Sequence, residues 1–196
     1  MSDHDAPDRS RGGSSMTPPP LTDALRAEAR AHPGGWVYAV DAGFDGAADV
    51  PPQGIVGAWR SDENGEVREE FVPNPRYVAT PRARGWAEPA TPLEDVLQLV
   101  RAGYGSTQQL LGAFASADVV VFSRPEGGLF LAPAQDGGRL VYAYTDAAKA
   151  TAAGYAEHAT LRGSELAAAV PAGVRIVLNP GSEPAAVIDP TEVTAP

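Results

Sequence analysis

The chain has 196 residues, a formal net charge of −10 at pH 7 and a pI near 4.7. A chain this acidic is repelled by nucleic acid and by anionic lipid, so neither is an expected main partner. It contains no cysteine, which excludes disulfides, thiolate catalysis and thiolate metal sites. Its 21 glycines and 19 prolines favour short elements joined by many loops.

Residues 1–20 are rich in Ser, Gly, Asp and Pro and have almost nothing to bury, so we expect a disordered tail. This segment lacks the apolar core of a secretory signal. The longest strongly apolar run of the chain, residues 119–122, is far too short to cross a bilayer. These features favour a cytoplasmic protein without membrane insertion.

An N-terminal α+β module is expected over residues 21–90. Apolar residues recur with helical spacing in residues 21–32, which predicts a short amphipathic helix. The aromatic and β-branched residues 36–41 then indicate a strand. A loop follows before the next apolar run.

Two further strands are expected at residues 54–60 and 66–72. Asn64 and Gly65 lie between them, and Asn-Gly between two strand-like runs is the strongest short-range signal for a hairpin. The next segment, residues 73–91, contains four prolines and is too rich in proline for a central strand or a helix interior. We expect it to form an extended loop on the surface.

A second α+β domain is expected over residues 91–196. Residues 91–94 form a capping box with Pro at the first helical position, and the helical apolar pattern that follows stops at Gly103. A second, weaker box at residues 106–109 opens another helix. Both helices should place a stripe of apolar side chains against the core.

The chain then turns to short strands. An antiparallel meander is predicted from three apolar runs joined by Gly-containing links, at residues 118–124, 128–133 and 139–146. Two short helices follow, one capped by Thr145 or Asp146 and the other by Ser164. Sequential helices and hairpins predict an α+β fold, with short helices packed on a mostly antiparallel or mixed sheet.

Residues 174–190, VRIVLNPGSEPAAVIDP, predict a strand, a turn and a strand. The turn consists of Asn179, Pro180 and Gly181. Pro180 presets φ and Gly181 tolerates a positive φ at the next position, as a type II turn requires.

None of the patterns typical of catalysis occurs. A phosphate-binding loop at residues 179–182 would need a Lys and a following helix, and Glu183 would repel the phosphate. There is no Gly-x-Ser-x-Gly elbow, and the three histidines lack the spacing of a metal site. We therefore expect no catalytic residue, no metal site and no cofactor.

Two alternatives stay open. In the first, the protein is an enzyme or a small-ligand sensor with an unrecognised pocket, centred on His158 and a nearby acid. A structure with His158 exposed to solvent and away from any cleft would remove that version. In the second, the protein is a dimeric structural module.

Arginines and aromatic residues alternate in the loop over residues 75–86. These residue types dominate the energetic hot spots of protein interfaces. The candidate partner contacts are Trp59, Arg76, Tyr77, Arg82, Arg84 and Trp86. In the alternative interpretation, Tyr77 and Trp86 pin the loop to its own core and the arginines pair with local acids, such as Glu69 and Glu70.

The same segments carry a family resemblance. GGWVYAVD, PPQGIVGAWRSDENGEV, PNPRYVATPRARGW and PLEDVLQLVRAGYG resemble the signature blocks of actinobacterial type VII secretion system-associated proteins. From about residue 91 onward, the chain resembles the SseB N-terminal-like domain, most clearly in its VLNPGS segment.

The resemblance implies an accessory protein of ESX-type secretion, a pathway that exports small helical-hairpin substrates. It implies a protein partner, either a component of the secretion system or a substrate. It supplies no catalytic residues to carry over, and the oligomeric state stays open.

Overall fold

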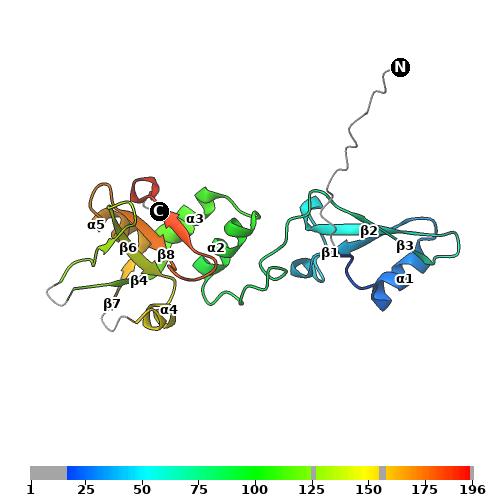
Figure 1. Cartoon of the computed structure of the whole chain (residues 1–196), viewed down its shortest axis with the longest axis horizontal. Helices are drawn as coiled ribbons and strands as arrows, with labels where there is room; N and C mark the ends of the chain where they lie inside the picture. Colours follow the sequence, from blue (N-terminus) through cyan, green and yellow to red (C-terminus); the bar gives the residue numbers. More distant parts are fainter. Residues whose placement is uncertain (1–16, 125–126, 155–157, 195–196) are drawn as a thin grey trace, which may run out of the picture. The chain divides into compact units, whose positions relative to one another are not determined.

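The computed structural model of the chain describes residues 17–124, 127–154 and 158–194 (Figure 1). The first sixteen residues of the predicted tail lie outside this part. The described residues form two compact units. The N-terminal unit contains the residues up to Val40 and Ala48–Tyr77, and the C-terminal unit contains Asp41–Ala47 and the residues from Val78 onward.

The N-terminal unit is a three-stranded antiparallel sheet with one helix. The strands follow the order β1-β2-β3, and the helix α1 lies beside them (Figure 1). The elements are α1 (Asp23–Ala31), β1 (Trp36–Val40), the 3-10 turn η2 (Pro52–Gly54), β2 (Ile55–Ser61) and β3 (Val67–Pro73). Buried side chains on α1 and on one face of the sheet make a small core, formed by Ala29, Val37, Ala39 and Trp59.

The hairpin predicted at Asn64 and Gly65 is confirmed by the pairing of β2 with β3. The Asp62 carboxylate accepts hydrogen bonds from the N–H groups of Asn64 and Glu66, each at 2.8 Å. Gly65 has φ 77°, which is a conformation that favours glycine. Local turn chemistry therefore determines this hairpin.

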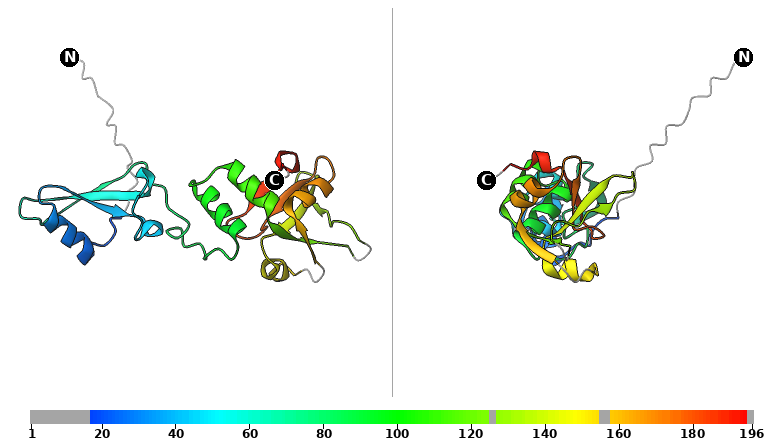
Figure 2. Two further views of the ribbon diagram at one scale, coloured as in Figure 1. Left: turned by 180° about the vertical axis from the view of Figure 1, so that it is seen from behind. Right: turned by 90° about the vertical axis from the view of Figure 1, so that its left-hand side faces the viewer.

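The C-terminal unit is a mixed sheet with helices on both faces (Figure 2). The strand order is β7-β4-β6-β8-β9, with β5 paired to β6, and only the β6–β8 pair is parallel among the described strands. The predicted α+β class is confirmed. The elements are the turn η1 (Ala42–Phe44), α2 (Pro92–Ala102), α3 (Thr107–Ser116), β4 (Asp118–Phe122), β5 (Ala132–Pro133), β6 (Arg139–Tyr144), α4 (Ala147–Ala152), β7 (His158–Arg162), α5 (Gly163–Ala169), β8 (Arg175–Leu178), β9 (Ala186–Ile188) and the turn η3 (Pro190–Glu192).

Two hydrophobic clusters show how this sheet is covered. The larger cluster joins α2, α3 and α5 to one face and includes Leu97, Phe114 and Leu166. The smaller cluster lies on the other face, where Ala150 of α4 packs with Val120, Phe122 and Tyr144. Both faces of the central strand β4 are therefore buried.

The predicted helix starts of α2 and α3 are confirmed. Thr91 Oγ1 accepts a hydrogen bond from the Glu94 N–H at 3.2 Å. The predicted box at residues 91–94 is only half formed, because the Glu94 carboxylate accepts from the Ala90 N–H, at 2.9 Å. Ser106 and Gln109 form a reciprocal capping box, with bonds of 2.7 and 3.2 Å. Capping depends on residues only three positions apart, which is why the sequence predicts it well.

The predicted meander is wrong in two respects. The segment 128–133 contributes only the two-residue strand β5, which pairs antiparallel with β6, and it meets the strand before it in the single antiparallel bridge Ser123–Leu129. Strand β4 itself pairs with β6 and β7. Gly127 and Gly128 both have positive φ, which interrupts an extended strand at its predicted start. Strand β7 lies in the segment between the two short helices predicted after the meander, for which no strand was predicted. It is an edge strand whose alternate side chains are exposed.

The start of α5 also differs from the prediction. The helix begins at Gly163 with Arg162 as its N-cap, and not after Ser164. Gly163 donates its N–H to Ala117 O at 2.9 Å. A Cβ at Gly163 would lie 1.9 Å from Phe114 O, so close packing against α3 determines where this helix starts.

The turn after β8 leads into the antiparallel strand β9. The Ser182 N–H donates to Asn179 O at 3.1 Å, and Gly181 has φ 77°, as in a type II turn. Asn179 is 1 % exposed, and its side-chain oxygen accepts from the N–H of Thr145, which follows β6, at 2.9 Å. The Asn179 side chain therefore ties the end of β8 to the end of β6.

The division between the units differs from the predicted boundary between residues 90 and 91. The Asp41 carboxylate accepts hydrogen bonds from the Thr80 N–H at 3.1 Å and from the Thr80 hydroxyl. The side-chain nitrogen of Gln98 on α2 donates to Ala87 O at 2.8 Å. These bonds fasten residues 78–90 to the C-terminal unit.

Candidate binding surface

The six residues predicted to contact a partner fall into different environments. Trp59 is 2 % exposed, and its ring centroid lies 4.7 Å from that of Phe71. Its side chain is part of the core, so Trp59 offers almost no surface to a partner, against the prediction. Arg76 is exposed and Tyr77 is half-buried, both at the end of the N-terminal unit.

The other three residues belong to the C-terminal unit. Arg82 donates to Ala42 O at 3.1 Å, and Arg84 donates to Ala79 O at 3.0 Å while its guanidinium lies 5.4 Å from the centre of the Trp86 ring. These contacts hold the loop in place. Arg82 also forms an exposed ion pair with Asp45 at 3.8 Å, so the alternative interpretation holds for this arginine. Within the described residues, no ion pair joins the loop arginines to Glu69 or Glu70.

A cavity of about 500 Å³ lies beside Trp86, between the loop, η1 and α2. Phe44 and Tyr104 form part of its wall, with ring centroids 5.6 Å apart. Burial, followed by the charge of Asp41, raises the pKa of Tyr104 above its usual value. Charged residues of both signs also line the cavity, so its electrostatics favour no particular ligand.

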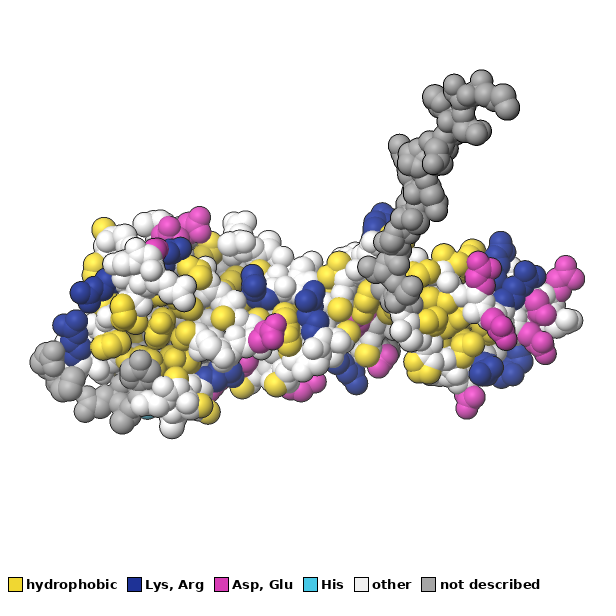
Figure 3. Space-filling model, viewed as in Figure 1, with side chains coloured by type: hydrophobic (Ala, Val, Ile, Leu, Met, Phe, Trp, Pro, Cys, Tyr) yellow, Lys and Arg dark blue, Asp and Glu magenta, His cyan; other side chains and the backbone are white. Residues whose placement is uncertain are grey.

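A different surface emerges on the N-terminal sheet. Trp36 is 40 % exposed, Tyr38 48 % and Val72 46 %, although each lies in a regular strand. We call the face that carries these three side chains the open face. In the space-filling view, hydrophobic side chains gather on the visible side of this unit and charged side chains lie at its end (Figure 3). Exposed apolar groups that adjoin one another are typical of interaction sites.

The register of the three strands gives the open face its shape. Tyr38 pairs with Ala58, and Ala58 pairs with Val72. A small residue between two larger ones makes a depression, which we call the trough, with Ala58 as its floor. A cavity of about 300 Å³ lies here, and Trp36, Arg76 and Pro52 also line it.

Two arginines lie at the ends of the trough. The guanidinium of Arg60 lies 4.9 Å from the centre of the Trp36 ring and 3.5 Å from Gly34 O. Arg76 lines the opposite end, beyond Asn74. Neither arginine forms an ion pair with a carboxylate of the described residues.

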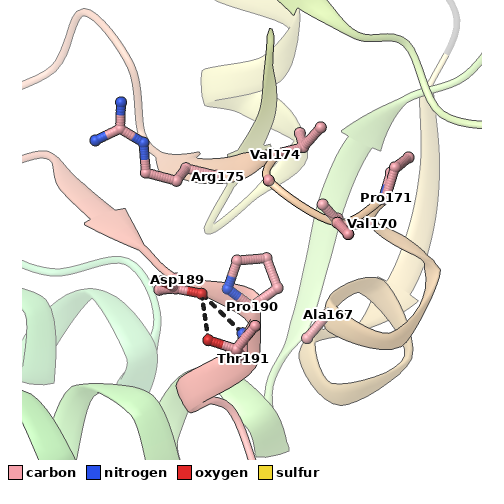
Figure 4. Close-up of a pocket in the computed structure, with 10 residues that line it drawn as sticks. Ala167, Val170, Pro171, Val174, Arg175, Asp189, Pro190 and Thr191 are labelled. Carbon is pink, nitrogen blue, oxygen red and sulfur yellow. Dashed lines mark hydrogen bonds between the residues drawn. The ribbon is translucent and has the colours of Figure 1, made fainter. Parts of the chain in front are cut away.

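A third cavity, of about 530 Å³, lies between α5, the loop before β8 and the turn η3 (Figure 4). Asp189 accepts hydrogen bonds from the hydroxyl and the N–H of Thr191, at 2.7 and 2.9 Å, and these bonds lower the pKa of Asp189. Arg175 points away from Asp189 (Figure 4). Most of the lining is Ala, Val, Pro and Gly, which supplies little chemistry for catalysis.

The most buried charge cluster is centred on the single lysine of the chain. Lys149 Nζ lies 3.0 Å from a carboxylate oxygen of Glu94 and 2.9 Å from one of Asp146. Burial opposes both charges, but hydrogen bonds raise the pKa of Lys149 above 10.5 and hold that of Asp146 below 3.8. All three groups are paired, so the cluster joins α2 to α4 and presents no reactive group.

His158 does not form a ligand site in the described structure. It is exposed at the start of the edge strand β7 and lines none of the cavities described above. The cavities described above therefore give no support to the version of the enzyme hypothesis centred on His158. Among the described residues, no group of three or more His, Asp or Glu side chains is arranged to hold a metal ion.

The open face was not predicted, although the sequence contains a signal for it. Trp36, Tyr38 and Val40 occupy alternate positions of β1, and the two aromatic side chains are larger than those of Val37 and Ala39 between them. Alternation in a strand separates two faces. The large side chains would ordinarily be assigned to the core, and only the tertiary structure shows that the smaller ones are buried.

A scan against family models matches residues 93–195, more than half of the 196 residues, to the SseB protein N-terminal domain. The predicted resemblance of this region is confirmed, whereas the relation to type VII secretion stays a prediction. Searches of curated proteins and of solved structures found no match. Within residues 17–124, 127–154 and 158–194, no helix has the length and apolar character needed to cross a bilayer.

Proposed function

Because the chain belongs to the family of the SseB protein N-terminal domain, we propose that it is a non-enzymatic accessory protein of type VII secretion. In this role it binds a component or a substrate of the secretion apparatus in the cytoplasm. The link to type VII secretion is supported by the resemblance of the segments within residues 34–105, most of which precede the matched domain.

The observation that carries a binding role is the open face. Burying the exposed parts of Trp36, Tyr38 and Val72 against a partner is worth about 1 kcal/mol or more for each side chain, before the cost of association. Aromatic residues and arginine are also enriched at interface hot spots. The open face combines both in one place.

Affinity capture from a native lysate at physiological salt tests this function. The full chain is compared with the double variant Tyr38→Ser/Val72→Ser and with Val187→Ser. Val187 is 60 % exposed on β9. Val187→Ser is therefore the control, because it removes an exposed apolar side chain from a strand of the C-terminal unit and leaves the open face intact. Captured proteins are identified and quantified by mass spectrometry.

We expect the full chain and Val187→Ser to recover a secretion component, and the double variant to lose it. Reproducible recovery of no secretion component by the full chain would contradict the proposed function. Equal recovery by the double variant would place the binding surface elsewhere on the chain.

A further inference from the structure

The trough on the open face has the width of an extended polypeptide. Neighbouring strands lie about 4.8 Å apart, so the backbones that carry Tyr38 and Val72 are separated by about 10 Å. An α-helix with its side chains is about 10–12 Å in diameter and would rest on these walls without reaching Ala58. An extended chain is narrower and can lie between them.

The length of the trough also suits a short segment. It follows β2 from Ile55 to Arg60, which is roughly 17 Å at 3.3 Å per residue, the span of about five extended residues. The Ile55 end is held in shape by Asn74, whose side-chain nitrogen donates to Ile55 O at 2.7 Å and to Pro52 O at 2.8 Å.

The charges at the two ends define the chemistry of the occupant. Arg60 and Arg76 are exposed cations without a carboxylate partner among the described residues, on a chain of net charge −10. Glu70 is the acidic residue that alternates with Val72 along β3, so it lies on the same face and opposes an anionic ligand near that edge.

We infer that the trough binds an extended peptide segment of a partner protein, with apolar side chains in its centre and a carboxylate toward each end. The apolar side chains lie on Ala58 between Tyr38 and Val72. The carboxylates pair with Arg60 and Arg76. This inference rests on the proposed function, since it names the class of partner segment that the accessory protein recognises.

Fluorescence anisotropy with defined peptides tests the inference. The probe is a labelled peptide with the core Asp-Val-Leu-Val-Asp between neutral linkers, and the matched control replaces both Asp residues by Asn. The full chain is titrated at about 50 mM and about 300 mM salt, because screening weakens exposed ion pairs. Amide hydrogen exchange verifies that each variant remains folded.

We expect the Asp peptide to bind at least about five-fold more tightly than the Asn peptide at low salt, and the difference to shrink at high salt. Arg60→Gln and Arg76→Gln should each weaken binding of the Asp peptide about two- to five-fold and leave the Asn peptide unaffected. Tyr38→Ser should weaken both peptides by about ten-fold or more. Glu70→Gln should tighten binding of the Asp peptide.

Equal affinity for the two peptides, no effect of either arginine variant, or no binding at all would overturn the inference. Light scattering that shows a dimer converted to monomers by Tyr38→Ser would also overturn it, in favour of a second copy of the chain. If the double variant Tyr38→Ser/Val72→Ser loses its captured partner while the peptides show no charge preference, the proposed function stands and only this inference fails. If the Asp peptide binds selectively but no secretion component is captured, the inference stands and the proposed function fails.

Discussion

Strands β1 and β4 are both five residues long and largely apolar, WVYAV and DVVVF, but they are buried differently. In β1 only the alternate residues Val37 and Ala39 are buried, whereas in β4 all four residues after Asp118 are buried. β1 is an edge strand of a sheet with one helix, and β4 is a central strand between two layers of helices. The difference shows that the number of covering elements, and not the apolar content of a strand, decides which faces are exposed.

Among its described residues, the N-terminal unit has one α-helix with which to cover its sheet, the nine-residue α1. The C-terminal unit has α2, α3 and α5 for one face and α4 for the other. A small unit buries a smaller fraction of its surface, and here the uncovered part is the face that carries Trp36 and Tyr38. The exposure of these aromatic residues is thus a consequence of the architecture of the unit.

The largest expected effect comes from the covered sheet. Phe114→Ala removes a fully buried ring from the larger cluster and should lower the stability of the C-terminal unit by about 3–5 kcal/mol. Hydrogen exchange followed by mass spectrometry can report each unit separately. Tyr38→Ala is the control on the open face and should change stability by no more than about 0.5–1 kcal/mol. Equal losses in the two variants would mean that the open face is covered in solution.

The second effect concerns α4, the helix that covers the second face of the C-terminal sheet. The corresponding face of the N-terminal sheet is the open face. Lys149→Met removes the bond to Glu94, whose side chain is 9 % exposed, and the bond to Asp146. The Glu94 carboxylate keeps the hydrogen bond from the Ala90 N–H at 2.9 Å but loses its cationic partner. A largely buried carboxylate without its counter-charge should cost about 1–3 kcal/mol near neutral pH. Chemical denaturation of both proteins measures the difference.

The pH dependence of this difference follows from the two pKa shifts. The pKa of Asp146 is lowered in the folded state. Its contribution to stability is therefore fully present above pH 3.8, the usual pKa of Asp, and is lost as the pH falls through the pKa of the folded state. The pKa of Lys149 is raised in the folded state. Its contribution to stability is therefore fully present below pH 10.5, the usual pKa of Lys, and is lost as the pH rises through the pKa of the folded state. We expect a plateau between these limits. A difference that is independent of pH in strong acid would show that the cluster does not hold α4.

The smallest expected effect is that of replacing a turn glycine, and each unit offers one, Gly181 and Gly65. Gly181 has φ 77° and open space around it, so Gly181→Ala should cost about 1 kcal/mol from backbone strain alone. Gly65 has the same φ, but a Cβ there would lie 2.7 Å from the Cα of Arg30, so Gly65→Ala should cost more. An unchanged melting temperature for Gly181→Ala would contradict the turn assignment.

Gly112 provides the matched control for these two substitutions. It lies inside α3 with open space around its Cβ position. Gly112→Ala should therefore raise stability by about 0.5–1 kcal/mol, because alanine favours the helical conformation. A decrease would show that the losses at the other two positions are a general response to alanine.

Local features of the fold were predictable and long-range ones were not. The caps at Thr91 and Ser106 and the hairpin at Gly65 depend on residues within a few positions of one another. The edge strand β7 was missed because the alternation of apolar and polar residues over its five positions is a weak signal. The helices predicted on either side gave stronger ones. Among the candidate contacts, Arg76 was placed on an exposed surface, whereas Trp59 was not, because its burial depends on packing by residues far away in the chain.

The sequence by itself determined the α+β class, the starts of α2 and α3, the turn at Asn179, Pro180 and Gly181 and the family, because these depend on short-range chemistry and on ordered motifs. The tertiary structure alone decided which side of each strand meets a helix. An apolar strand has two chemically similar faces, and only the number and position of the covering helices distinguish them. That is why the sequence directed attention to the Pro-rich loop, whereas the structure leaves the large side chains exposed on the open face, where Ala58 lies between Tyr38 and Val72.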